Sequence, residues 1–476
     1  MAQVPSAATQ FGLDIWFQIS KHCDRDTLRL LSTHQVHSVV RESALPYLFK
    51  DLHFKASNLL RPEDRSLTLI PQEYENLLDA RADQCCQRFT QLPLSRLAPY
   101  VRVWFYDAHF DDDGEPEAAV KSKIDKYNRD MWRFFAANLA RYTELTSLSL
   151  TKVVIDETAV RSLNTLANLK SLMLFYADIT STINLGSPYI RLIVLEHCLD
   201  NFHSGFIIGA CATLASLRIQ VGKKDYRTLY DVLEHCPVLE ELLLTLRDVI
   251  ERVFEAPAEA LSITACPNLT TYLGPAYYAG VIQGRPVRDI DISRCPEDGE
   301  MHVEWLKICG SGTVPVEEFS IYGWPTYAIP GLFPVIIENF PHLMALRIVF
   351  SPYVLEVYDM EDRENYKKLH YLSVIQDVST GKYEVPRTLR SLGIFQNRKY
   401  KKHRTITIAQ VVDRIQSSER FADLDRIMFG YDAENFHVWC IDETDEWSIT
   451  QYGEENIDGE DGDDSSDEYT DDDYDE

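Results

Sequence analysis

The chain has 476 residues, of which 45% are hydrophobic and 11% aromatic, and its formal net charge at pH 7 is −27. This length exceeds what one compact core accommodates, so several domains or a repeat array are expected, and the composition is that of a folded protein. The negative charge argues against general binding to nucleic acid, which requires a positive surface.

The N-terminus does not predict a targeting segment. Residues 1–10, MAQVPSAATQ, have neither a basic stretch nor an apolar stretch, so they predict a disordered start rather than a secretory signal. The longest stretch without Asp, Glu, Lys or Arg, residues 260–284, is interrupted by prolines and glycines and does not predict a membrane span. The ten cysteines form no C-x-x-C pair, which favours the reducing cytosol or nucleus.

Residues 11–54 predict a module of three short helices. Asp24 supplies an N-cap oxygen for the second helix, and Pro46 fits the first turn of the third. Helices this short bury little surface, so an outside partner is expected to complete their core. The first helix carries an apolar stripe at helical spacing, made by Leu13, Ile15, Trp16, Ile19 and Cys23.

This module carries a family resemblance. The runs LDIWFQISKHCDRDTLRLLS and ALPYLFKDLHF resemble the F-box of fungal F-box proteins, and depart from its pattern at Gly12, His34, Gln35 and Ser38. In that family the F-box binds a Skp-type adaptor, which links it to a cullin-RING ubiquitin ligase. The alternative interpretation of the module is a cap on a repeat array. The resemblance implies that the adaptor is contacted by Leu13, Ile15, Ile19, Leu28, Leu31, Leu45, Leu48 and Phe49.

Residues 55–97 predict a helical linker, and residues 98–450 predict a leucine-rich-repeat solenoid. An apolar-x-x-apolar-x-apolar template recurs there, with starts 19 to 29 residues apart between Leu145 and Leu389. That spacing is close to the ~20–29 residues of a leucine-rich repeat. The copies start at Tyr100, Leu145, Leu169, Ile190, Leu214, Leu239, Ala258, Val287, Val316, Leu343, Leu369, Leu389 and Phe421.

Two further signals support the repeat. Cys198, Cys266 and Cys295 each follow the last apolar residue of a copy by three positions, where a side chain bonds the turning backbone. Helix-like stretches end before Pro237 and Pro341 in CPVLEELLL and FPHLMALRI, which resemble repeats of F-box/leucine-rich-repeat proteins. The predicted fold class is α/β: a three-helix F-box-like module, then an irregular solenoid with parallel strands on the concave face and helices on the convex face.

The concave face is where a solenoid of this type holds a partner. The leucine positions of each strand point into the core, so the residues between and just after them line that face. Aromatic and arginine side chains dominate binding hot spots, although aromatics in such positions also pack against inserted loops. The candidate target-binding residues are Phe175, Arg218, Tyr322, Arg347, Tyr371 and Phe395.

Two charged segments lie near the C-terminus. Residues 451–476 predict a disordered acidic tail, because residues 454–476 contain 14 acidic residues and no Lys or Arg. The basic run RKYKKHR at residues 398–404 predicts either a solvated loop or a nuclear-import or phosphate contact.

No pattern in the chain predicts catalysis. The phosphate-loop motif, G-x-S-x-G and H-E-x-x-H are all absent from the sequence, and no cofactor or metal site is predicted. The leading hypothesis is a non-catalytic substrate-recognition subunit of a Skp-cullin-F-box ubiquitin ligase, located in the cytoplasm or nucleus and monomeric outside that complex. The alternative is a leucine-rich acidic scaffold that binds basic proteins such as histones and has no role in ubiquitylation.

Overall fold

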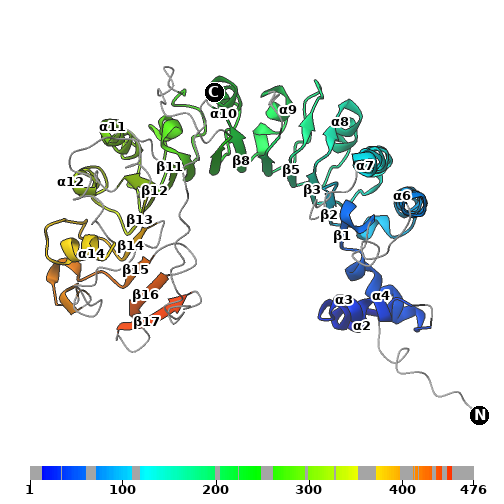
Figure 1. Cartoon of the computed structure of the whole chain (residues 1–476), viewed down its shortest axis with the longest axis horizontal. Helices are drawn as coiled ribbons and strands as arrows, with labels where there is room; N and C mark the ends of the chain where they lie inside the picture. Colours follow the sequence, from blue (N-terminus) through cyan, green and yellow to red (C-terminus); the bar gives the residue numbers. More distant parts are fainter. Residues whose placement is uncertain are drawn as a thin grey trace, which may run out of the picture. The chain divides into compact units, whose positions relative to one another are not determined.

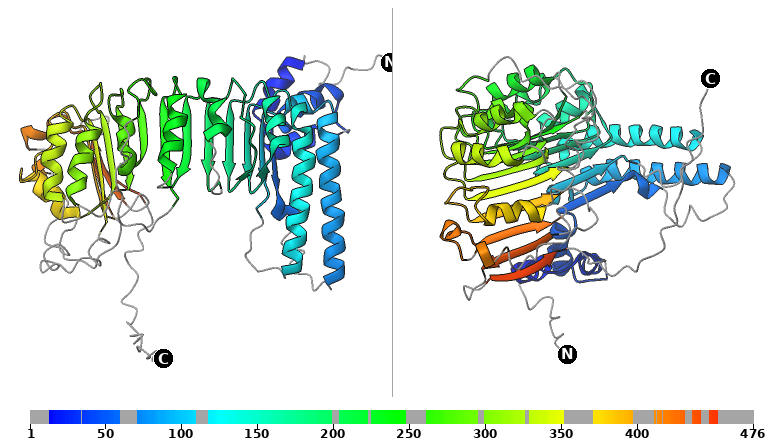
Figure 2. Two further views of the ribbon diagram at one scale, coloured as in Figure 1. Left: turned by 90° about the horizontal axis from the view of Figure 1, so that it is seen from above. Right: turned by 60° about the vertical axis from the view of Figure 1, so that its left-hand side comes forward.

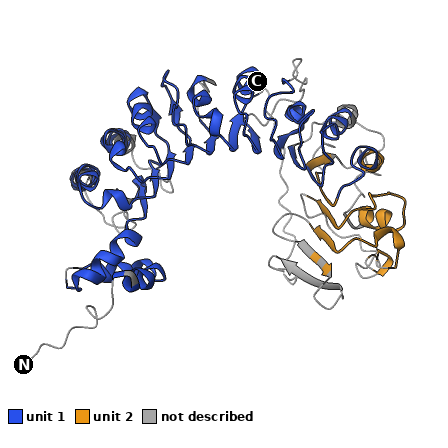
Figure 3. Ribbon diagram, turned by 180° about the vertical axis from the view of Figure 1, so that it is seen from behind, with its two compact units in different colours: residues 1–321, 335–343 blue, residues 322–334, 344–476 orange. Residues whose placement is uncertain are grey.

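The chain forms two compact units, residues 1–321 with 335–343 and residues 322–334 with 344–476 (Figure 3). The computed structural model describes residues 13–33, 35–59, 71–109, 118–198, 204–222, 225–247, 261–294, 299–325, 329–351, 371–396, 411, 413–415, 417–430, 436–441 and 447–452. The basic run at 398–404, Cys295 and the tail after residue 452 lie outside these ranges.

The first unit is built on a sheet whose strands follow one another in chain order (Figure 1). Each pair with a defined register is parallel. A separate two-stranded parallel sheet pairs β4 (Val154–Ile155) with β6 (Asp178–Ile179). The strands of the main sheet are β1 (Asp51–Lys55), β2 (Val103–Asp107), β3 (Ser147–Thr151), β5 (Ser171–Phe175), β7 (Leu192–Glu196), β8 (Ser216–Val221), β9 (Glu241–Leu246), β10 (Thr271–Pro275), β11 (Asp289–Arg294) and β12 (Glu318–Pro325).

The helices from α6 to α11 lie along the outer side of the sheet, whereas α2, α3 and α4 lie at its β1 end; α6 and α7 run side by side well beyond the strands (Figures 1 and 2). The α-helices are α2 (Leu13–Lys21), α3 (Arg25–Leu31), α4 (Ser38–Leu48), α6 (Pro71–Leu94), α7 (Ala118–Asn138), α8 (Glu157–Asn164), α9 (Ser204–Ile208), α10 (Tyr226–Glu234) and α11 (Gly299–Cys309). Short 3-10 helices are η1 (Ala56–Leu59), η2 (Ala98–Tyr100), η3 (Leu139–Arg141), η4 (Cys211–Thr213) and η6 (Ala276–Ile282).

The second unit has fewer repeats and a different end. Strands β13 (Ala345–Ser351), β14 (Ser391–Gln396) and β15 (Arg426–Gly430) pair in parallel, and α14 (Tyr371–Ser379) precedes β14. Strands β16 (Phe436–Ile441) and β17 (Trp447–Tyr452) then continue the sheet in antiparallel pairing. Strand β12 and helix α12 (Ile329–Asn339) contribute residues to both units, and η9 (Glu419–Phe421) lies before β15.

The predicted α/β solenoid is confirmed, and its core follows from the repeat template. The three apolar residues of the Leu145 copy are fully buried, and those of the Leu169 and Leu239 copies are at most 1% exposed. Because side chains alternate along a strand, the second and third of these residues enter the core on the same face. The proline signals are also confirmed, since α10 ends at Glu234 before Pro237, and α12 ends at Asn339 before Pro341.

For three copies of the template, the predicted strand or the predicted buried residues are wrong. In the described part of the Ala258 copy, Leu261 and Ile263 lie outside any strand and Ile263 is exposed; the strand that follows is β10, in which Tyr272 is buried. Residues 371–374 of the Leu369 copy belong to α14, because apolar spacing of this kind also suits a helix face. In the Tyr100 copy the parity is reversed, since Trp104 points into the core.

The last and weakest copy of the template starts three residues later than predicted. Strand β15 begins at Arg426 and buries Ile427 and Phe429, so the copy starts at Leu424 rather than Phe421. All three of these apolar residues, like Phe421 itself, are buried.

The N-terminal module also differs from its prediction in extent. Asp24 caps α3 as expected, with its Oδ1 accepting a 2.7 Å hydrogen bond from the backbone N–H of Thr27. The third helix starts earlier, at Ser38, which puts Pro46 in its last turn. The sheet begins with β1, which lies within the segment predicted to be helical. Strand β1 pairs with β2, although the long helix α6 separates the two strands in the sequence.

Candidate functional site

The helical module at the N-terminus has a small core of its own. Helix α4 packs against both α2 and α3, and Leu28, Val40 and Ala44 are buried there. The buried hydroxyls of Ser20 and Ser43 lie 3.2 Å apart and join α2 to α4 by a hydrogen bond. The three helices thus pack their inward side chains against one another within the module.

Large apolar side chains remain exposed on the same helices. Leu13 is 44% exposed, Ile15 47% and Ile19 42%, all on α2, and Leu30 of α3 is 68% exposed. Concentrated exposure of large apolar residues in a folded protein marks an interaction surface more often than single scattered residues do. We call these three exposed residues of α2, Leu13, Ile15 and Ile19, the α2 face; Ile15 and Ile19 lie on one side of the helix, and Leu13 is its first residue.

The eight residues implied as adaptor contacts therefore separate into three groups. Leu13, Ile15 and Ile19 are exposed. Leu28 and Leu45 are buried in the module and pack in its core. The remaining three residues, Leu31, Leu48 and Phe49, are partly buried.

The second candidate surface is the strand face that is turned away from the helices. The registers of the first unit align one outward residue of each strand in a row: His53, Phe105, Ser149, Met173, Val194, Arg218, Leu243, Leu273, Asp291 and Ser320. Arg218 belongs to this row as predicted, and its guanidinium forms an ion pair with the Glu196 carboxylate. Phe175 lies one row away, beside Glu196 in the register of β5 and β7.

In the second unit the structure brings three of the predicted residues together. The Arg347 guanidinium lies 4.7 Å from the centre of the Phe395 ring and 5.5 Å from that of Tyr322. Phe395 is nearly inaccessible, at 1% exposure, so it supports Arg347 more than it offers a surface. Tyr371 begins helix α14 and is not in a strand, so the reason for placing it on the strand face is wrong.

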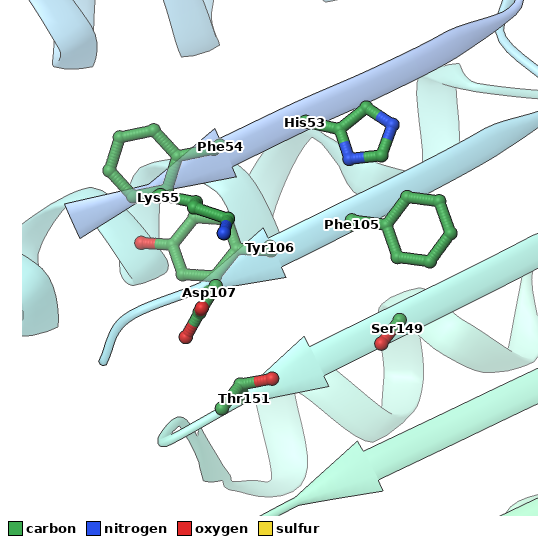
Figure 4. A pocket seen from close by; sticks show the side chains of 8 residues that line it. All are labelled: His53, Phe54, Lys55, Phe105, Tyr106, Asp107, Ser149 and Thr151. Atoms are coloured by element: carbon green, nitrogen blue, oxygen red, sulfur yellow. The ribbon is translucent and has the colours of Figure 1, made fainter. Parts of the chain in front are cut away.

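A small hollow opens at the start of the sheet, over β1, β2 and β3 (Figure 4). Its volume is about 160 Å³, which suits one side chain and is smaller than the ~300 Å³ of the smallest usual ligand pockets. The His53 and Phe105 rings stack along it at 4.5 Å, and Lys55 and Asp107 pair in the register at its end. The Asp107 carboxylate accepts a 2.8 Å hydrogen bond from the backbone N–H of His109.

Backbone strain marks the ends of three adjacent strands, a feature that sequence reasoning missed. Lys152, Tyr176 and His197 have φ values of 54°, 52° and 51°, the left-handed region that non-glycine residues adopt at a cost. Each immediately follows a strand, β3, β5 or β7, and the Tyr176 and His197 rings stack at 4.5 Å. The repeat of this conformation in neighbouring coils reflects the same sharp turn after each strand.

The cysteines in the described ranges are free thiols, and burial holds Cys198, Cys266 and Cys309 in their neutral form. Burial raises the pKa of Cys198 to about 11 and the pKa values of Cys266 and Cys309 to about 12. The Cys198 thiol lies 3.6 Å from the Leu174 and Glu196 carbonyl oxygens, as the repeat predicts. Cys266 instead donates to the Leu233 carbonyl at 3.1 Å, because the strand predicted before it does not form. A neutral buried thiol is a poor nucleophile.

Within the described residues, no group of three or more His, Cys, Asp or Glu side chains is arranged to hold a metal ion. None of the helices in that part of the chain combines the length and the apolar content needed to cross a lipid bilayer. The geometry therefore offers two surfaces for contact, the α2 face and the strand face, and a small hollow between residues of β1, β2 and β3.

Neither a protein-family model nor a curated protein matches this sequence. Among solved structures, the chain is similar to an internalin (InlF) from Listeria monocytogenes, with 12% identity, a TM-score of 0.23, and coverage of 62% of this chain and 83% of the other. It is also similar to a chain in the Rad7 and Elc1 complex in yeast, with 13% identity, a TM-score of 0.26, and coverage of 74% and 99%. The strands and registers themselves define the class of this protein, a leucine-rich-repeat solenoid with an N-terminal helical module.

Proposed function

We propose that this chain is the non-catalytic substrate-recognition subunit of a Skp-cullin-F-box ubiquitin ligase, present in the cytoplasm or nucleus. The helical module binds a Skp-type adaptor through the α2 face, and the strand face of the solenoid binds a protein target. Ubiquitin transfer is then the chemistry of other subunits, and this chain contributes proximity and orientation.

The observation that carries the proposal is the exposure of Leu13, Ile15 and Ile19 on a module that already has a core of its own. A helix that served only to cap the solenoid would bury such residues against the first repeat and present polar side chains to water. These residues also belong to the segment whose sequence resembles an F-box. The resemblance and the exposure support the same surface independently.

The test is co-purification of the full chain with a Skp-type adaptor. Wild type is compared with Leu13→Asp/Ile19→Asp, which puts two charges on the α2 face without touching the module core. Leu94→Asp is the matched control, because Leu94 is an exposed leucine (61%) on α6, outside the module. The unfolding midpoint of each variant establishes that it is folded.

We expect wild type and Leu94→Asp to bind the adaptor in a one-to-one complex and the double variant to lose it. Adaptor binding that is absent in folded wild type, or that survives in the double variant, would refute the role of the α2 face. A chain that binds no adaptor but loses binding to histones when residues 453–476 are deleted would instead support the acidic scaffold.

A further inference from the structure

The second unit contains an arginine that is held in place but has no carboxylate partner in the described part of the chain. Arg347 projects from β13, Phe395 from β14 and Tyr322 from β12, and the guanidinium lies 4.7 Å from the centre of the Phe395 ring and 5.5 Å from that of Tyr322. An arginine close to aromatic rings is stabilised by cation–π attraction, which leaves its N–H groups able to donate.

Glycine makes this arrangement possible. Gly393 pairs with Arg347 in the register of β13 and β14. A Cβ at Gly393 would lie 2.8 Å from Cε2 of Phe395 and 3.3 Å from Cγ of Arg347, so any larger residue would displace the ring or the arginine stem. Because Phe395 is also nearly inaccessible, the guanidinium is supported by a ring that has little freedom to move. A partner binding there loses little of the arginine's conformational entropy.

The two arginines of the strand faces differ in their electrostatic state. Arg218 is neutralised by the Glu196 carboxylate, whereas none of the ion pairs among described residues involves Arg347. The Nε of Arg347 is buried without a hydrogen-bond acceptor. A buried donor without an acceptor is costly, so Arg347 is held there by the packing of its stem and the two rings and not by a hydrogen bond of Nε.

We propose that Arg347 binds the carboxylate of an acidic segment in the protein target. A guanidinium and a carboxylate match in shape and in charge, and form two parallel hydrogen bonds. Arg347 is the one described cation over the Tyr322 and Phe395 rings, so a single negative charge is balanced there, whereas a phosphate dianion would keep a net charge. This inference rests on the proposed function to the extent that the strand face holds a protein target.

The first stage of the test identifies peptides that need Arg347. The full chain is used to select from a random 12-residue peptide library displayed on phage, and the selection is repeated with Arg347→Met. We expect wild type to enrich peptides with Asp or Glu at one fixed position, and the variant to lose that enrichment. A selection that yields no Arg347-dependent acidic peptide would overturn the proposal.

The second stage is a double-mutant cycle on one selected synthetic peptide. Replacing its acidic residue by the amide should weaken binding to wild type by at least about 10-fold, and Arg347→Met should weaken binding of the original peptide equally. If the two groups contact each other, the combined change weakens binding little further. Arg161→Met is the control and should leave the affinity unchanged, because Arg161 is an exposed arginine on helix α8, outside the strand face, and pairs with Glu157.

Two further measurements keep the outcome interpretable. Arg347→Lys retains the charge and most of the stem but lacks the planar fork, so we expect it to weaken binding at an unchanged unfolding midpoint. A peptide with phosphoserine in place of the acid that binds more than 10-fold tighter would overturn the carboxylate assignment. Retained adaptor binding by Arg347→Met separates failure of this site from failure of the proposed function.

Discussion

Arg285 offers a direct test of how the irregular segment before β10 is held. The residue is only 1% exposed, yet its guanidinium donates to three backbone carbonyls: Ala265 at 2.9 Å, Gln283 at 2.8 Å and Ser262 at 2.6 Å. Two of these carbonyls belong to the segment for which a strand was predicted and none forms. The arginine therefore supplies hydrogen bonds that a strand would have obtained from its neighbours.

Substituting Arg285→Met keeps an apolar stem of similar length and removes all three donors. A buried group that loses its partner costs about 1–3 kcal/mol, so three carbonyls, partly relieved by relaxation, give a loss of about 3–5 kcal/mol. That is a large part of the 5–15 kcal/mol by which a domain is usually stable. Arg285→Lys should fall between, because one ammonium cannot reach all three oxygens in the geometry of a planar fork.

Equilibrium unfolding in urea, monitored by tryptophan fluorescence, measures the change in the free energy of unfolding. Arg288→Met is the matched control, because Arg288 is an exposed arginine that pairs with Glu317 at 2.7 Å. An exposed ion pair contributes at most about 1 kcal/mol, so this control should unfold almost as wild type does. The reasoning would be refuted if Arg285→Met lost no more stability than Arg288→Met.

Two other features give stability predictions of known sign. Tyr176→Gly should be more stable than Tyr176→Ala by about 1 kcal/mol in urea unfolding, since both lack the ring and only alanine keeps the strain at φ 52°. Equal stability of the two variants would contradict the strain. Burial and the neighbouring Glu318 carboxylate raise the pKa of Asp289, so the folded chain binds this proton more tightly than the unfolded chain. Stability from this group is present at low pH and is lost as the pH rises through the raised pKa. Asp289→Asn should therefore stabilise the chain at pH 7, by an amount that shrinks as the pH falls towards about 4; a benefit independent of pH would contradict the raised pKa.

The α2 face and the strand face differ in chemistry, and each suits a different kind of partner. The α2 face is apolar and lies on a module with its own core, which suits a permanent partner of defined shape. The strand face carries charged and aromatic side chains on a regular ladder, which suits recognition of a particular target. If both proposals hold, substitutions on one surface should leave binding at the other unchanged, because the residues involved share no contacts.

The sequence alone determined most of the repeat architecture, because a strand that buries one face must alternate its apolar residues. Copies such as Leu145-Leu148-Leu150 therefore predicted both the strand and the side of each residue correctly. The same logic failed where both faces are apolar: in the segment around Trp104 the neighbouring Val103 and Phe105 are apolar too, and pattern alone does not choose between the two parities.

Other errors came from features that a local pattern does not contain. Tyr272 was overlooked as a core residue although it is fully buried, and its hydroxyl donates to the Pro275 carbonyl at 2.8 Å. The apolar spacing in residues 369–374 satisfies a helix as well as a strand, and the structure places residues 371–374 in helix α14. The burial of Tyr272 and the helix at residues 371–374 both depend on packing against neighbouring repeats, which a local pattern does not contain.

The candidate surfaces divide in the same way. The apolar character of α2 was visible in the sequence, and helical spacing alone puts Ile15 and Ile19, four residues apart, on one side of the helix. That these residues stay exposed while Leu28 and Leu45 turn inward follows from how the three helices pack. The approach of Tyr322, Arg347 and Phe395, more than 70 residues apart in total, was likewise decided by the tertiary structure. Strand registers set which side chains become neighbours, and registers are fixed by contacts between segments that are remote in the chain.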